Sequence, residues 1–152
     1  MSLGAQRPDT TIAGVPVAVW ASTTLGPGRA SGSESTILGA QFALWASSDR
    51  VAFGIRRAGA SNGDNRDTYD TALLVGRRVR AAGATVVGAL GFGVISGTRS
   101  GDAIDSEIGL SAAVECALNA RYVGVGFAGF GAIGSNARFV GAGFTLELGK
   151  IE

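Results

Sequence analysis

Apolar side chains recur at every second position over much of this chain. The clearest stretch lies near its end, where one face carries Val140, Ala142, Phe144, Leu146 and Leu148. The opposite face is small or polar apart from one aromatic residue, and carries Phe139, Gly141, Gly143, Thr145 and Glu147. A period of two predicts an extended strand, because successive side chains leave a pleated backbone on opposite sides.

The same pattern repeats along the chain, and no segment shows a helical stripe. We predict eight strands, at about 11–23, 35–46, 51–58, 68–80, 84–96, 105–118, 121–133 and 137–149. Pro16 interrupts the first of these, and a proline in a strand suggests an edge or a bulge. The fold class expected is all-β, with residues 1–152 as one domain and residues 1–9 as a flexible N-terminal segment.

The connections between these segments differ in length. Tight turns are expected at 47–50, 81–83 and 119–120, and longer polar loops at 26–34, 59–67 and 97–104; a short connection, 134–136, comes last. Alternation of this kind places the long loops at one end of an up-and-down antiparallel meander, and both termini at the other. The asymmetry is typical of a small outer-membrane β-barrel.

Composition favours an apolar outer surface. Charged residues make up 16% of the chain, against roughly 25% in an average soluble domain. If the apolar faces point outward, the small residues leave room for larger polar groups in the narrow lumen of an eight-stranded barrel. Buried charges require partners, so we expect a polar network there, made of Gln41, Arg56, Arg78, Arg80, Glu107, Glu115 and Glu147.

Several side chains are expected at the two edges of the apolar surface. Arg57 and Arg77 fall on apolar faces near strand ends, where a long side chain can reach lipid headgroups. Aromatic residues beside the turns and loops are candidates for interface anchors: Trp45, Tyr69, Tyr122 and Phe139.

The segments TALLVGRRVRAAGATVVGALGFGVISG and ARYVGVGFAGFGAIGSNARFVGAGFTLELGK resemble the glycine-rich hairpins of small eight-stranded bacterial outer-membrane β-barrel proteins. The resemblance covers most of the chain as a pattern rather than a motif. It implies a barrel inserted in the outer membrane, with the lipid bilayer as its partner. It also implies a structural or surface-interaction role, with loops 26–34, 59–67 and 97–104 available to a surface ligand. The oligomeric state stays open.

Other functions find little support in the residues. The chain has no histidine, which removes the commonest general base and zinc ligand. Cys116 lies on an apolar face and is interpreted as a small hydrophobic residue. Two overlapping G-x-G-x-x-G matches, at 124–129 and 129–134, are not followed by a helix, so they do not predict a dinucleotide site. The net charge of +1 gives no reason to expect nucleic acid.

Acidic residues offer two further candidates, and both are interpreted as structural. The stretch 62–70 gathers three carboxylates but lacks the EF-hand spacing, so a solvated loop is preferred to a calcium site. Glu107 and Glu115 share a strand face about 27 Å apart, too far for joint acid–base chemistry. We therefore expect no catalytic residues, no metal and no cofactor.

A second hypothesis is a soluble barrel. It would bind a hydrophobic ligand or pack as a subunit of a larger assembly, with its apolar face lining a cavity or an interface. The N-terminus MSLGAQRPDTT has no basic segment followed by an apolar core, so it does not resemble a signal peptide, which favours this alternative.

Overall fold

The computed structural model describes residues 11–12, 15–31, 37–61, 67–99 and 102–150; the expected flexible segment 1–9 lies outside them. Eight long strands form a wall: β2 (Val15–Ala30), β3 (Ile37–Ser48), β4 (Val51–Ser61), β5 (Asp67–Ala81), β6 (Ala84–Arg99), β7 (Asp102–Asn119), β8 (Val123–Ile133) and β9 (Arg138–Lys150). A short strand, β1 (Thr11–Ile12), pairs with the start of β2. The described part of the chain contains no helix long and apolar enough to cross a membrane.

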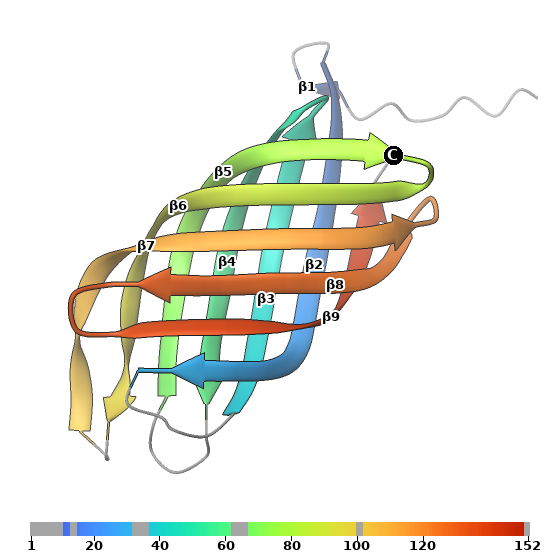
Figure 1. Ribbon diagram of the computed structural model, residues 1–152. Helices are drawn as coiled ribbons and strands as arrows, with labels where there is room; N and C mark the ends of the chain where they lie inside the picture. Colours follow the sequence, from blue (N-terminus) through green and yellow to red (C-terminus); the bar gives the residue numbers. More distant parts are fainter. Residues whose placement is uncertain (1–10, 13–14, 32–36, 62–66, 100–101, 151–152) are drawn as a thin grey trace, which may run out of the picture.

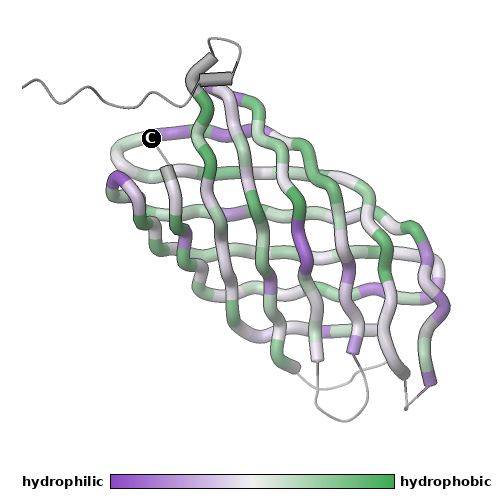
Figure 2. Tube along the Cα trace, turned by 180° about the vertical axis from the view of Figure 1, so that it is seen from behind, coloured by the Kyte–Doolittle hydropathy of each residue, from purple (hydrophilic) through white to green (hydrophobic). Residues whose placement is uncertain are grey.

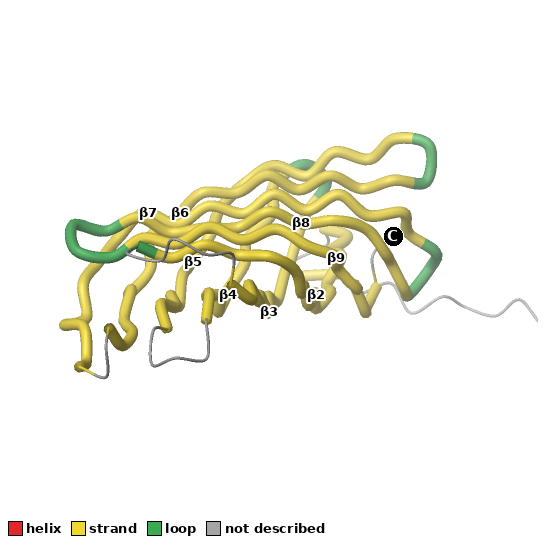
Figure 3. The backbone as a smooth tube through the Cα atoms, turned by 60° about the horizontal axis from the view of Figure 1, so that its bottom comes forward, coloured by secondary structure: helices red, strands yellow, loops and turns green. Residues whose placement is uncertain are grey.

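The wall closes on itself. Each strand pairs antiparallel with the next in sequence, and β9 pairs with β2 from Val19↔Lys150 to Ala30↔Phe139. The strands of one wall cross those of the opposite wall at a steep angle (Figure 1), which reflects the tilt that closure imposes on a small barrel. A second view separates the two walls as layers (Figure 3). The predicted all-β, up-and-down antiparallel barrel of eight strands is therefore confirmed.

The two ends of the barrel differ. Tight turns follow β3, β5 and β7, and the C-terminal end of β9 lies at the same end of the barrel (Figure 1). We call this the turn end, and the opposite end the loop end. Ala82 and Gly83 form the β5–β6 turn with φ angles of 49° and 80°. Positive φ at both central residues is the backbone of a type I′ turn, whose twist suits a two-residue hairpin.

The strands extend further into the loop end than expected. Residues 26–30 belong to β2, 59–61 to β4, 67 to β5, 97–99 to β6 and 102–104 to β7, so the described parts of the expected loops 26–34, 59–67 and 97–104 are strand, apart from Ser31. Residues 32–36, 62–66 and 100–101 lie outside the described part of the chain. These stretches were expected to be polar loops, yet Gly26 lies where a Cβ would overlap the backbone of Ala142, so glycine permits close strand contact.

Prolines are accommodated without a change of register. The β2–β3 ladder begins at Val17, so Pro16 precedes the paired wall and faces only β1. Pro27 pairs with Leu38 of β3, whereas the β2–β9 ladder lapses after Leu25 and resumes in the same register at Gly28. The missing N–H of proline thus interrupts one ladder locally and leaves the strand intact.

The apolar faces point outward and the polar faces inward. Phe92, Leu110 and Phe144 are 67%, 56% and 72% exposed, whereas Arg78 and Glu115 are 3% and 1% exposed. Figure 2 shows hydrophobic and other residues alternating along the strands. Inside, small apolar groups pack around Trp20 and Trp45 toward the turn end, and around Phe130 and Phe139 toward the loop end.

Candidate functional site

The barrel interior holds the most concentrated polar chemistry that the structure describes. Because alternate residues of a strand point to the same side, each strand directs a series of polar side chains to the inner face of the wall. The buried polar and charged residues are Ser22, Thr24, Gln41, Ser47, Arg56, Thr68, Asp70, Arg78, Thr85, Ser111, Glu115, Thr145 and Glu147. Apart from the four threonines, they gather into three groups, at different heights along the barrel.

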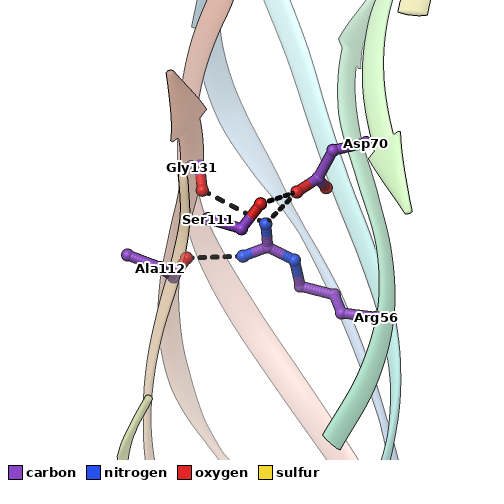
Figure 4. Close-up of polar contacts among 5 residues, drawn as sticks. All are labelled: Arg56, Asp70, Ser111, Ala112 and Gly131. Atoms are coloured by element: carbon purple, nitrogen blue, oxygen red, sulfur yellow. Dashed lines mark hydrogen bonds and ion pairs between the residues drawn. The ribbon is translucent and has the colours of Figure 1, made fainter. Parts of the chain in front are cut away.

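The first group centres on Arg56 of β4 (Figure 4). Its Nη2 lies 2.6 Å from Oδ2 of Asp70 on the neighbouring strand β5, and both side chains are fully buried. The same guanidinium donates across the barrel to the carbonyl oxygens of Ala112 and Gly131, at 2.5 and 3.1 Å. Ser111 Oγ donates to Asp70 Oδ2 at 2.5 Å. The pair therefore ties β4 and β5 to the opposite wall, at β7 and β8.

The second group centres on Glu115 of β7. Its Oε1 accepts hydrogen bonds from Ser22 Oγ and Gln41 Nε2, both at 2.8 Å, and from Trp45 Nε1 at 3.2 Å. All three donors come from β2 and β3, across the lumen. A buried carboxylate needs several donors to offset its lost hydration, and this group supplies them.

The third group lies toward the turn end and contains Arg78 and Glu147. Arg78 Nη1 donates to Ser47 Oγ at 2.9 Å, and its guanidinium carbon lies 4.8 Å from the centre of a Trp20 ring. Glu147 is close enough to Arg78 to interact with it electrostatically. Trp20 in turn stacks on Trp45, with ring centroids 6.1 Å apart, so this group is continuous with the one around Glu115.

Glycines on neighbouring strands make room for the largest inward side chains. A Cβ on Gly54 would come within 2.5 Å of the Trp45 ring, and one on Gly141 within 2.6 Å of Phe130. The register explains both contacts, because Trp45 pairs with Gly54 and Phe130 with Gly141. The glycine content therefore serves the packing of a narrow lumen.

Most of the expected lumen residues lie in these groups. Gln41, Arg56, Arg78, Glu115 and Glu147 are all buried and inward-facing. The structure places Arg80 and Glu107 elsewhere. Arg80 is exposed at the turn end. The carboxylate of Glu107 caps the β8–β9 turn at the loop end, where it accepts the backbone N–H groups of Ser135, Asn136 and Ala137 at 3.0, 3.0 and 2.9 Å and the Ser135 hydroxyl.

The predicted interface position was wrong for two of the four aromatic residues. Trp45 and Phe139 are 1% and 4% exposed and point into the barrel. Closeness to a strand end suggested an interface position, but parity along the strand decides the face, and both residues share parity with inward-facing neighbours. Tyr122 is exposed, and Tyr69 is partly exposed on the outer face beside Arg57, whose guanidinium carbon lies 4.6 Å from the ring centre.

Sequence reasoning missed Asp70, Ser22 and Ser111. Asp70 closes the acidic stretch 62–70 and was grouped with its loop, although it belongs to β5. Its spacing of two from Thr68 and Ala72, both buried, was the available signal. Serines give no such signal, because they are common on either face of a strand. Among the described residues, no group of three acidic, histidine or cysteine side chains is placed to hold a metal ion.

The outer surface is a broad apolar belt. Large hydrophobic side chains at least two-fifths exposed occur on all eight wall strands. Examples from four of them are Leu25, Leu73, Leu90 and Leu110, at 59, 68, 68 and 56% exposed. Cys116 also lies exposed on this face. A monomeric soluble protein rarely exposes so large a contiguous apolar area.

Comparisons with known proteins bear on the fold. No protein-family model and no curated protein matches the sequence. Among solved structures, the chain is similar to the crystal structure of Neisserial surface protein A, with a TM-score of 0.64 and 11% sequence identity. The match covers 87% of this chain and 96% of that one. The chain therefore shares the barrel fold of that surface protein.

Proposed function

We propose that this protein is an integral outer-membrane β-barrel with a non-enzymatic role in envelope structure or surface interaction. The observation that carries the proposal is the inversion of its surfaces: charged and amide side chains fill the interior, and large hydrophobic ones face outward. Such an apolar exterior is suited to contact with the acyl chains of lipids. A closed barrel also leaves no unpaired strand edge within the bilayer.

The dimensions of the apolar belt support this. On β7 its outward large residues run from Ile108 to Leu118, which is about 34 Å along an extended strand. With a tilt of about 40°, that length projects to about 26 Å along the barrel axis, close to the apolar band of outer-membrane barrels. The guanidinium group of Arg57 contacts the ring of Tyr69, which lies nearer the loop end. This direction is expected of a long side chain that extends toward the lipid headgroups.

The filled interior favours a structural or surface role over passage of solutes. The Arg56 group links β4 and β5 to β7 and β8, and the Glu115 group links β7 to β2 and β3. A solute would have to break buried, charge-assisted hydrogen bonds in both groups. The absence of histidine from the sequence weakens the case for hydrolytic chemistry, and the fold shared with a surface protein supports a role at the cell surface.

Folding into lipid tests the proposal. We expect the purified chain to aggregate without detergent, to fold into phosphatidylcholine vesicles, and to show heat-modifiable mobility on a denaturing gel. Leu90→Arg, at the centre of the belt, should destabilise the folded state by about 2–4 kcal/mol. Ala120→Arg in the exposed β7–β8 turn is the matched control and should change little. A monomer that stays folded and soluble without detergent would refute membrane insertion.

The alternative of a soluble barrel now takes a narrower form. A hydrophobic ligand inside the barrel is disfavoured, because the interior is lined by charged groups and the apolar faces point away from it. Packing as a subunit of a larger assembly would cover the outer belt. That function predicts a soluble oligomer of defined mass in the detergent-free experiment, whereas the membrane proposal predicts aggregate.

A further inference from the structure

Charge is distributed unevenly between the two ends of the barrel. When the buried lumen residues Arg56, Asp70, Arg78, Glu115 and Glu147 are left aside, the described turn end carries the basic positions Arg50, Arg77, Arg80, Arg121 and Lys150 and one acidic position, Asp49. On the same basis, the described loop end carries four basic positions, Arg29, Arg57, Arg99 and Arg138, and four acidic ones, Asp67, Asp102, Asp105 and Glu107. The turn end is therefore the basic end of the described barrel.

Each of the three tight turns presents arginine. Arg50 lies in the β3–β4 turn, Arg80 two residues before the β5–β6 turn, and Arg121 in the β7–β8 turn, and all three are exposed. Arg121 lies against the ring of exposed Tyr122, with its guanidinium carbon 4.9 Å from the ring centre. Because these turns alternate with pairs of strands, the arginines are spread around the barrel rim.

Arg50 and Arg77 form the densest part of this rim. Arg77 pairs with Val51, the residue after Arg50, and the next backbone N–H, that of Arg78, donates to the Arg50 carbonyl at 2.8 Å. On the other side, Arg77 pairs with Gly88, where a Cβ would meet nothing within 4 Å. Arg77 thus lies between Arg50 on one side and open space beside Gly88 on the other, at the edge of the apolar belt, and both arginines are exposed.

Resting on the membrane function proposed above, we infer that this turn-end arginine rim binds the phosphate groups of anionic phospholipids. The acyl chains of such a lipid would lie on the belt beside Val51 and Val79, which are 44% and 53% exposed. Its phosphate would then meet Arg50 and Arg77 at the rim. Guanidinium groups bind phosphate oxygens in paired hydrogen bonds, and a second arginine adds charge that a zwitterionic headgroup would not neutralise.

Lipid selectivity of the folded protein tests this inference. The wild type, R50Q/R77Q/R121Q and the matched loop-end variant R29Q/R57Q/R138Q are folded into phosphatidylcholine vesicles, and insertion is verified by heat-modifiable mobility. Spin-labelled phosphatidylglycerol and phosphatidylcholine then report the relative association constant of the two lipids at the barrel surface. A failure to insert would refute the membrane function itself, and is scored before any lipid preference is measured.

We expect the wild type to prefer phosphatidylglycerol, and the turn-end variant to lose about fivefold or more of that preference, since a basic residue near an anionic surface contributes about that factor. The loop-end variant should retain the preference, although it loses the same charge. Added salt should weaken the preference in the wild type. Equal loss in both variants, no preference in the wild type, or equal competition by inorganic phosphate would overturn the inference.

Discussion

Removing the carboxylate of Asp70 should be among the most damaging single changes to the barrel. Arg56 would keep its two carbonyl acceptors, Ala112 and Gly131, but would lose its only counter-charge within hydrogen-bonding distance among the described residues. Breaking a buried ion pair from one side costs about 3–5 kcal/mol, because the remaining charge stays buried and uncompensated. Ser111 would lose its acceptor as well. We therefore expect Asp70→Ala to lower the free energy of unfolding by about 3–4 kcal/mol.

Equilibrium urea unfolding in lipid vesicles measures this change. Tryptophan fluorescence reports it directly, because Trp20 and Trp45 are both buried inside the barrel. Asp67→Ala is the matched control, since Asp67 begins the same strand and is only partly buried. It should cost less than about 1 kcal/mol, within the range of ordinary surface changes.

A double-mutant cycle separates the ion pair from general packing. The cycle compares the single variants Arg56→Met and Asp70→Leu with the double variant that carries both. The double variant removes the isolated charge and should recover most of the stability lost in Asp70→Leu. The coupling free energy should then exceed about 1.5 kcal/mol. A loss for Asp70→Ala no larger than that for Asp67→Ala, or losses that simply add in the double variant, would refute the reasoning.

Three further changes test local packing and turns. Gly91→Ala should destabilise the barrel by about 1–3 kcal/mol, because its Cβ would overlap the Leu73 carbonyl oxygen, whereas Gly88→Ala on the same strand meets open space and should be neutral or stabilising by urea unfolding. Ala82→Asn should stabilise by about 0.5–1 kcal/mol, since asparagine tolerates the positive φ of this turn, and an unchanged midpoint would contradict that. Glu107→Ala should speed amide hydrogen exchange in the β8–β9 turn, whose N–H groups it binds; unchanged exchange there would show that the cap is dispensable.

Local sequence sufficed for the strands and for which residues share a face. The alternation from Phe139 to Leu148 predicted both, because a pleated backbone places Phe144 and Thr145 on opposite sides. That the apolar faces point outward was predicted instead from the low charge content of the whole chain. Local sequence failed at the loop end, where the polar stretch that contains Gly26 and Pro27 was expected to be a loop. Neither breaks β2: the glycine permits a close contact with β9, and the proline lacks only one N–H in a ladder that continues around it.

The interior contacts needed information that no local window holds. Arg56 and Asp70 lie on adjacent strands, but their partners Ser111, Ala112 and Gly131 come from the opposite wall. Which inward residues meet depends on the tilt and stagger of the closed barrel, and these follow from the register of all eight wall strands together. Trp45 shows the same limit, because its indole reaches Glu115 across the lumen rather than the nearby turn.

The pairing of β2 with β9 has a consequence for biogenesis. β2 is the first wall strand in chain order and β9 the last. The two strands therefore cannot pair until the ribosome has synthesised every hairpin between them. Until then the unclosed sheet has two unpaired strand edges, which promote aggregation. Closure is thus a late, long-range event in maturation. A chain lacking β9 would leave one edge of β2 and one edge of β8 without a pairing partner, so the whole barrel would fail to close.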